Sequence, residues 1–308
     1  MRSTRPRRTG GQTRFHVHAS QEWKGHLSES PGTSTGLMYA QDSIADGGVV
    51  GHWLLGNLPQ TRPWLRVVEL LGLGADASTV AEATLQAAER GLERVRDDEG
   101  FVHAVWLLTQ LPLAAKTEDF RSALQQLGID VPSQVTVDDI VTGFMSAVDR
   151  HLERKGGRTD LGELAQLAAA EVLTTVGHDL AEDLYEASPE RVRQGVAKLN
   201  TVSQFGRLGS AFFASFLNRY LVGLLSRELS NHVGPGYRFS STQECGEFTR
   251  ALDDHCREAA VIVQRFSGEW FSSKAYRGPI TRRTAANFAH GGVSKLRKEL
   301  AIRARKDG

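Results

Sequence analysis

Cysteine is nearly absent from this sequence, which holds Cys245 and Cys256 as its two thiols in 308 residues. Two thiols cannot build a disulfide framework, so the composition argues against a small secreted scaffold and favours free thiols in a reducing compartment. A secretory signal would also need an apolar core of about 7 to 15 residues behind its basic start. Polar residues follow the arginine-rich start of this chain instead, and we expect a cytoplasmic protein.

Long hydrophobic runs are missing as well. The most apolar stretch, 205–233, is interrupted by Asn218 and Arg219. The uninterrupted run falls well short of the about 18 apolar residues that a membrane span requires. No membrane association is therefore expected.

Motifs for cofactors and metals are equally scarce. The stretch Gly291-Gly292-Val293-Ser294-Lys295 offers backbone amides and a lysine to a phosphate, but it lacks the spacing and the preceding strand of a nucleotide loop. We interpret the glycine pair as a helix break. His232, Cys245, His255 and Cys256 lack the paired spacings of zinc ligands. The sequence thus predicts neither a metal site nor a cofactor.

Reactive side chains are most concentrated around His255. On a helix, His255 and Glu258 stand three positions apart and could orient one another beside the Cys256 thiol. Cys256 also falls on the apolar stripe of that helix, where burial raises the pKa of a thiol and makes it unreactive. Core packing is the favoured interpretation, and an enzyme centred on His255, Cys256 and Glu258 is the alternative.

Helical periodicity is what the sequence has in abundance. Within 205–233, two neighbouring i, i+4 ridges are apolar, and the polar positions form one narrow stripe that includes Ser215 and Arg219. Small residues such as Gly209 would let a second backbone approach closely. We predict a central buried helix that the rest of the chain covers, stopped by Gly234-Pro235-Gly236.

The remaining chain predicts an all-α, multi-helix globular body behind a disordered basic leader at residues 1–48. An N-terminal helical subdomain is expected at 49–155 and a C-terminal one at 156–308, divided at Gly156-Gly157. Four local expectations can be checked against a structure. They are a capping box of Thr79 and Glu82 on a helix to about Val95, a helix ended or kinked by Pro112, a short strand at Tyr237–Thr242, and the break at Gly291-Gly292.

Charge is distributed unevenly along the chain. Residues 1–14 carry five arginines and no acid, and residues 274–308 carry a net charge of +8, which leaves −12 for residues 15–273 at a total of +1. Such basic ends suit nucleic acid, an acidic partner or the chain's own acidic body, or they only keep the protein soluble. The candidate binding residues lie on the C-terminal helix: Lys295, Arg297, Lys298, Arg303, Arg305 and Lys306.

Gly32-Thr33-Ser34 stands in a Gly-, Ser- and Pro-containing leader ahead of a mostly helical body. In this respect the chain resembles a family of helical accessory proteins encoded beside a QueC-like enzyme and an ATPase in bacterial anti-phage operons. In that family the motif follows the initiator methionine, whereas Pro31 precedes it here. The resemblance implies a non-catalytic component with partners from the same operon, and it implies that the QueC-like neighbour processes or modifies Gly32.

The expected function is therefore that of an interaction or scaffold component in a bacterial multi-protein system, with anti-phage defence as the implied setting. The first alternative is a nucleic-acid-associated protein that binds through its basic ends. The second is the enzyme centred on His255. The oligomeric state is left open, because burial of the apolar surface cannot be judged from one sequence.

Overall fold

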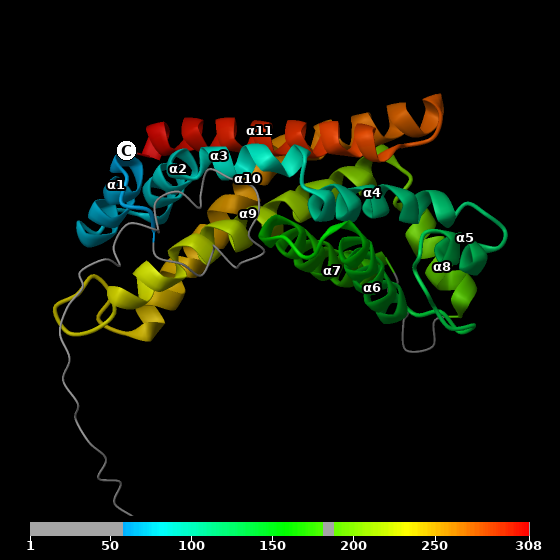
Figure 1. Ribbon diagram of the computed structural model, residues 1–308, viewed down its shortest axis with the longest axis horizontal. Helices are drawn as coiled ribbons and strands as arrows, with labels where there is room; N and C mark the ends of the chain where they lie inside the picture. The colour runs from blue at the N-terminus through cyan, green and yellow to red at the C-terminus, as the bar shows by residue number, and fades with distance from the viewer. Residues whose placement is uncertain (1–57, 181–187, 308) are drawn as a thin grey trace, which may run out of the picture. The chain divides into compact units, whose positions relative to one another are not determined.

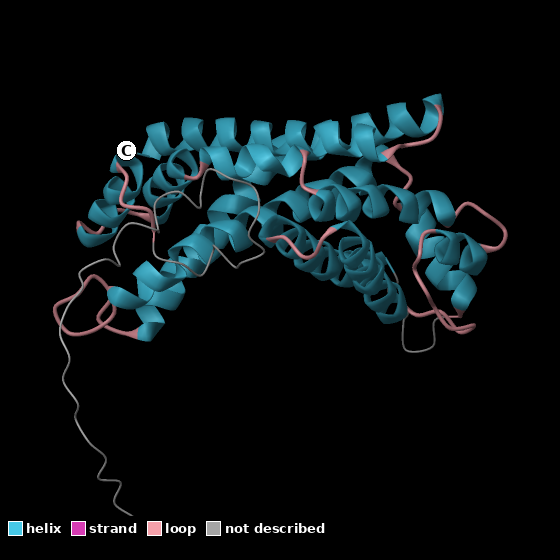
Figure 2. Ribbon diagram, viewed as in Figure 1, coloured by secondary structure: helices cyan, strands magenta, loops and turns pink. Residues whose placement is uncertain are grey.

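The structure is a computed structural model that describes residues 58–180 and 188–307 (Figure 1). Every regular element in these two ranges is a helix, which confirms the all-α prediction (Figure 2). The elements are α1 (Arg62–Gly72), α2 (Ala77–Ala87), α3 (Glu89–Glu93), the 3-10 helix η2 (Arg94–Arg96), α4 (Glu99–Ala114), α5 (Phe120–Gln126), α6 (Val137–Lys155), α7 (Asp160–Leu180), α8 (Pro189–Lys198), α9 (Val202–Asn231), α10 (Thr242–Arg277) and α11 (Arg282–Asp307).

By its internal contacts the chain divides into two units, residues 1–49 and 50–308. All the helices above belong to the second unit, and the leader predicted at 1–48, including Gly32, lies outside the described residues. At the boundary predicted inside the body, α6 ends at Gly156 with a left-handed φ of 108°. The next helix, α7, packs on both α4 and α6, so helices from the two sides of this boundary share contacts.

The central helix predicted at 205–233 is α9. Thr201 caps its start by accepting a hydrogen bond from the backbone of Gln204, and the helix then runs to Asn231. Both apolar ridges are buried, and α9 packs most extensively on α10 and also on α7 and α2. Burial on several sides is what its two apolar ridges require.

Close approach of α9 and α10 depends on small residues, as predicted for Gly209. A Cβ atom on Gly209 would lie 2.6 Å from the side chain of Ser267, and one on Gly206 would lie 2.6 Å from the Gln264 carbonyl oxygen. In return, Gly268 of α10 accommodates the backbone of Val202. Glycines on both helices therefore set the distance at which the two backbones pack.

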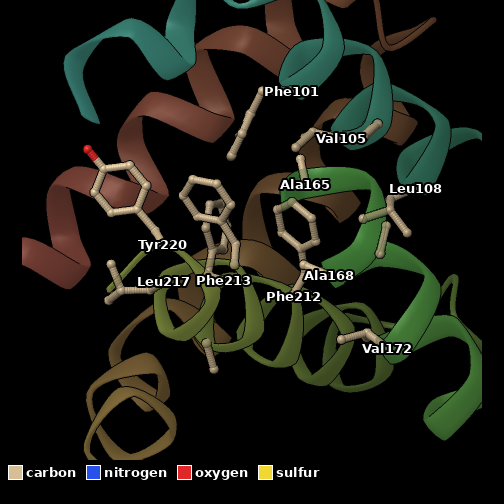
Figure 3. Packing of buried hydrophobic residues seen from close by; sticks show 14 of the residues in the cluster. Phe101, Val105, Leu108, Ala165, Ala168, Val172, Phe212, Phe213, Leu217 and Tyr220 are labelled. Atoms are coloured by element: carbon tan, nitrogen blue, oxygen red, sulfur yellow. The ribbon is translucent and has the colours of Figure 1, made fainter. Parts of the chain in front are cut away.

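Aromatic rings fill the space between α4, α7 and α9. Phe101 of α4 meets Phe216 edge to face at 4.6 Å between ring centroids, and it meets Phe212 at 5.9 Å. Figure 3 shows Phe212 of α9 beside the small residues Ala165 and Ala168 of α7. Edge-to-face pairs add about 0.5–1.5 kcal/mol each beyond the buried area, so this cluster anchors α9 to α4.

The starts and stops of several helices match their local signals. Ser188 caps α8 with Pro189 in its first turn, and Thr136 and Asp139 form the reciprocal capping box of α6. The box predicted at Thr79 and Glu82 is wrong. Asp76 is the N-cap of α2 and accepts a hydrogen bond from the Thr79 backbone. A carboxylate three positions upstream satisfies the helix's unpaired N–H groups, so α2 begins earlier than predicted.

Three further expectations differ from the structure. The helix expected to run to about Val95 ends at Ala87, and α3 and η2 follow it as separate short elements. Of the two alternatives given for Pro112, an end of the helix at that residue is wrong, because α4 continues to Ala114, with the Asn200 side chain hydrogen-bonded to the Pro112 carbonyl. The predicted strand Tyr237–Thr242 is a turn whose regular pairing is one isolated bridge between Val233 and Phe239, because no neighbouring strand is at hand to extend it.

Helix α9 is long and apolar enough by composition to cross a membrane. The interruptions at Asn218 and Arg219 therefore do not by themselves exclude a membrane span, contrary to the expectation from the sequence. Of its most apolar 18-residue window, 61% is buried inside the structure. The core helix of a folded body meets the same composition test.

Candidate functional site

The predicted catalytic candidates lie near the middle of α10. Cys256 is fully buried, and this burial raises the pKa of its thiol to about 12. His255 is also buried, whereas Glu258 is exposed and forms an ion pair with Arg303 of α11 at 3.0 Å. A thiol that stays protonated inside a packed core is not a nucleophile. The Glu258 carboxylate is on the surface and pairs with Arg303, so it does not act on the Cys256 thiol.

A second polar group joins α7 and α9. The Ser215 hydroxyl donates a 2.7 Å hydrogen bond to Glu171, and Arg219 donates one of 2.8 Å to the same oxygen. Burial alone would raise the pKa of Glu171, but these two hydrogen bonds outweigh it and lower the pKa below its ordinary value. A carboxylate held ionised in this way is a poor base for activating a serine, so the group fits a structural role.

The glycine pair of α11 is neither a helix break nor a phosphate seat. Helix α11 is continuous from Arg282 to Asp307, so the backbone amides at 291–294 lie inside the helix and not at its start. A Cβ atom on Gly292 would lie 2.2 Å from the ring of Phe213, and one on Gly291 would lie 3.1 Å from the ring of Phe266. The glycines are there because aromatic rings from α9 and α10 press against the α11 backbone.

The basic half of α11 is partly neutralised by the chain itself. Arg297 forms an ion pair with Glu89 of α3, and Arg303 forms ion pairs with Glu258 and Glu299 at 3.0 Å. The sequence had left open that the basic end contacts the chain's own acidic body, and these pairs are such contacts. Their guanidinium groups are consequently less available to an outside anion.

The other candidates on this half differ in their surroundings. Lys295 is exposed, and its ammonium group lies 5.3 Å from the centre of the Phe266 ring. Lys298 is exposed without an ion pair to any described residue, beside a hollow of about 330 Å³ between α2 and α11. The side chains of Arg305 and Lys306 lie outside those that the structure describes.

A column of four planar groups, absent from the predictions, joins α11, α4 and α6. The Arg282 guanidinium lies 4.7 Å from the centre of the Trp106 ring, Trp106 stacks on His103 at 5.5 Å, and His103 stacks on His151 at 3.9 Å. His151 then donates a 3.1 Å hydrogen bond from Nε2 to Glu99. His103 is 3% exposed, and its Nδ1 atom has no hydrogen-bond partner among the described residues.

The two imidazoles of this column are held neutral. Burial, and next the neighbouring His151, lower the pKa of His103 to about 3. Burial also lowers the pKa of His151, although its hydrogen bond with Glu99 partly opposes the shift. Arg282 and Arg154 act in the same direction on His103 because a nearby positive charge disfavours protonation.

Cations stand at the helix ends that flank Arg282, the outer member of the column, and Arg154 at the end of α6 is close enough to His103 to lower its pKa, as Arg282 does. We call Arg154, Lys274, Arg277, Arg282 and Arg283 the cationic corner; it lies at the end of α6 and on both sides of the α10–α11 turn. No described acidic residue forms an ion pair with any of the five. Tyr276, on the same turn, is 93% exposed. The Glu99 carboxylate is the acid within the column, where it serves His151 and Lys155.

Sequence reasoning missed this corner although part of its signal was visible. The basic segment begins at Lys274 and contains no acidic residue before Glu299. The predicted binding residues, however, all lie in the denser run of cations that follows Ser294. Arg154 is on α6, and its nearness to His103 of α4 depends on tertiary packing. Of the two rings that stack on His103, Trp106 is three positions away on the same helix, whereas His151 is on α6, and no local spacing rule predicts that second contact.

In the part of the chain that the structure describes, no three His, Cys, Asp or Glu side chains are grouped so that they could hold a metal ion. No protein family, curated protein or solved structure matches the chain. The resemblance to the helical accessory proteins therefore stays a prediction.

Proposed function

We propose that this protein is a non-catalytic interaction or scaffold component of a bacterial multi-protein system, with anti-phage defence as the setting that the resemblance implies. The observation that carries the proposal is the outer face of α10. Val261 is 61% exposed and Ile262 is 47% exposed in the middle of this 36-residue helix. Two large aliphatic side chains at adjacent exposed positions favour a contact surface over a plain solvated face.

The charges around these two side chains favour a protein as the occupant. Arg257 is paired with Asp253 at 2.7 Å on one side, and Arg265 is paired with Glu269 at 2.6 Å on the other. Each pair cancels its own charge, so the surroundings of Val261 and Ile262 offer no excess of cations to a nucleic acid. An apolar centre inside a rim of satisfied polar groups is typical of protein interfaces.

The chemistry of the described residues supports the non-catalytic part of the proposal. The Cys256 thiol is buried and protonated, Glu258 is engaged with Arg303, and Glu171 is held ionised by two donors. General acid–base or nucleophilic catalysis needs an accessible group whose pKa suits proton transfer. An interaction role asks for none of these, and its partner is expected among proteins encoded beside this one.

The test is affinity purification of the tagged protein from its native host at moderate and high salt, followed by reconstitution with the partner that mass spectrometry identifies. Changing Val261→Glu together with Ile262→Glu should weaken the reconstituted complex at least tenfold, since truncating or charging a central interface residue costs about 2 kcal/mol or more. The matched control is Leu73→Glu, another aliphatic side chain that is 73% exposed, which should leave affinity unchanged. A partner bound equally by both variants, or a chain that only self-associates, would contradict the proposal.

The implied modification of Gly32 has its own readout. Intact-mass measurement of the purified chain should show added mass or cleavage at that residue when the QueC-like neighbour is present. A Gly32→Ala chain from the same strain should keep its unmodified mass. An unmodified wild-type chain would remove this part of the resemblance while leaving the α10 surface to be judged separately.

A further inference from the structure

The cationic corner differs from other basic surfaces of the molecule because its charge is not cancelled. Arg154, Arg277, Arg282 and Arg283 are exposed, and none forms an ion pair with a described residue. Like charges at the ends of three helices raise the local positive potential, which costs stability unless an anion is bound. An unneutralised cluster in a chain whose residues 15–273 are acidic overall points to an anionic ligand.

The corner is also held in place before any ligand arrives. Trp106 donates a 2.9 Å hydrogen bond from its indole nitrogen to the Ile280 carbonyl, and Gln110 donates a second one of 3.3 Å. Ile280 itself is buried, which pins the turn between α10 and α11 onto α4 (Figure 1). A turn fixed in this way presents its flanking cations with little further loss of entropy on binding.

Arg282 shows how a cation is positioned without being neutralised. Its guanidinium lies over the face of Trp106, and it forms no ion pair with a carboxylate in residues 58–180 or 188–307. A planar guanidinium stacked on a ring keeps its N–H donors at the rim, where they can bind phosphate oxygens in pairs. The histidines beneath it carry no charge at neutral pH, so the arginine does not compete with an imidazolium for the anion.

Tyr276 decides which kind of anion fits. Its side chain is 93% exposed on the segment between Lys274 and Arg277, so the described residues leave both faces of the ring largely uncovered. A flat aromatic surface beside phosphate-binding cations is how proteins hold single-stranded nucleic acid without reading its sequence. A lipid surface would instead favour exposed aliphatic side chains, and the aliphatic residue of this turn, Ile280, is buried.

We propose that the cationic corner binds the phosphate backbone of single-stranded nucleic acid, with Tyr276 stacking on a base. This surface is distinct from the basic half of α11 and from the α10 face, and its role does not depend on the protein partner proposed above. Five cations contacting phosphates predict an affinity that falls about 100-fold between 50 and 200 mM salt, because each contact releases condensed counterions.

The experiment measures fluorescence anisotropy of labelled 20-nucleotide oligo-dT and oligo-U with the full-length protein at 50 and 200 mM salt. Arg277→Glu with Arg283→Glu should weaken binding at least tenfold and reduce the salt slope by about 1.4, the value for two lost contacts to a single strand. Tyr276→Ala should weaken binding about fivefold or more, with the salt slope unchanged. All three positions are exposed, so helical content should stay that of the wild type.

The matched control is Lys295→Glu with Lys298→Glu, which changes the net charge by the same amount on the other half of α11. It should weaken binding no more than threefold. Every variant keeps the five arginines of residues 1–14, so any contribution of these arginines to the affinity is the same in the variants that are compared. The proposal is overturned by absent or salt-independent binding, by equal losses in the two double variants, or by binding to phosphatidylserine vesicles without binding to either oligonucleotide.

Discussion

The two halves of α11 are both basic, yet the structure gives their charges different surroundings. In the second half, Arg297 and Arg303 meet glutamates from α3 and α10. In the first half, Arg282 meets the face of Trp106, and Arg283 has no charged partner among the described residues. A count of lysines and arginines along a helix therefore does not measure the charge that a ligand encounters. That charge also depends on the acidic residues that other helices place beside the cations.

The difference follows from distances along the sequence that no local pattern spans. Glu89 is 208 residues from Arg297, and Glu258 is 45 residues from Arg303. Such exposed ion pairs contribute only about 0–1 kcal/mol each to folding. Their main consequence is on binding, because they remove two guanidinium groups from a surface that the sequence presents as the more basic one.

The largest expected effect comes from disturbing the packing of α11 on α9, which holds α11 in place beside its neighbours. Replacing Gly292 with valine places a Cβ atom where the Phe213 ring now lies, 2.2 Å away. We expect the free energy of unfolding to fall by about 3 kcal/mol, since overpacking a filled core forces side chains off their rotamers and shifts the backbone. Urea unfolding followed by circular dichroism measures the change.

Gly246→Val is the control for this substitution. Gly246 also lies inside a helix, α10, but a Cβ atom there meets nothing within 4 Å. Because valine has the higher helix propensity, that variant should be at least as stable as the wild type. Equal destabilisation of the two variants would show that Phe213 does not set the packing of α11, and the contrast between its halves would lose its structural basis.

A smaller effect concerns the stacked histidines that support Arg282 in the first half of α11, because they make the free energy of unfolding depend on pH. The pKa of His103 is lowered to about 3 in the folded chain, and that of His151 is lowered as well. As the pH falls below about 6.5, the unfolded chain therefore takes up protons that the folded one does not, and stability is lost. Between pH 7.5 and pH 5.0, His103 alone should reduce the free energy of unfolding by about 2 kcal/mol.

His103→Phe keeps a ring between Trp106 and His151 while removing the titrating group, so its loss over the same pH interval should be about 2 kcal/mol smaller than that of the wild type. The control is His290→Gln, an exposed histidine of α11 outside the column, measured over the same pH interval. Parallel curves for wild type and His103→Phe would mean that the buried pair does not resist protonation.

Local sequence signals predicted the elements of this fold well where the physics is local. The N-caps at Ser188 and Thr136 and the stop at Gly156 depend on residues within three or four positions of each helix end. The two apolar ridges of α9 likewise encode its burial. Helix capping and amphipathicity act over one or two turns, which is the range a sequence pattern covers.

The same reasoning failed where a distant residue supplies the cause. Gly291-Gly292 has the propensity of a break, but the rings of Phe213 and Phe266 are what require glycine there, and the helix continues. The cationic corner was missed because Arg154 and Arg282 come together only through the packing of α4 between their elements. The ring that requires a glycine and the acid that neutralises an arginine are both far from that residue in the sequence.

The smallest expected effect would bring the two halves of α11 closer in behaviour. Glu89→Gln with Glu258→Gln keeps the shape of both side chains and removes the charges opposite Arg297 and Arg303. Folding should lose no more than about 1 kcal/mol, because both pairs are partly exposed. Oligonucleotide affinity at 50 mM salt should rise about threefold to tenfold, and the salt slope should steepen by up to about 1.4 as two more cations reach phosphate.

Glu247→Gln with Glu269→Gln is the matched control, since it removes the same charge from exposed pairs on α10 and should raise the affinity by a smaller factor with an unchanged slope. If the two double variants bind equally, net charge alone governs binding, and the internal pairing of Arg297 and Arg303 does not distinguish one half of α11 from the other.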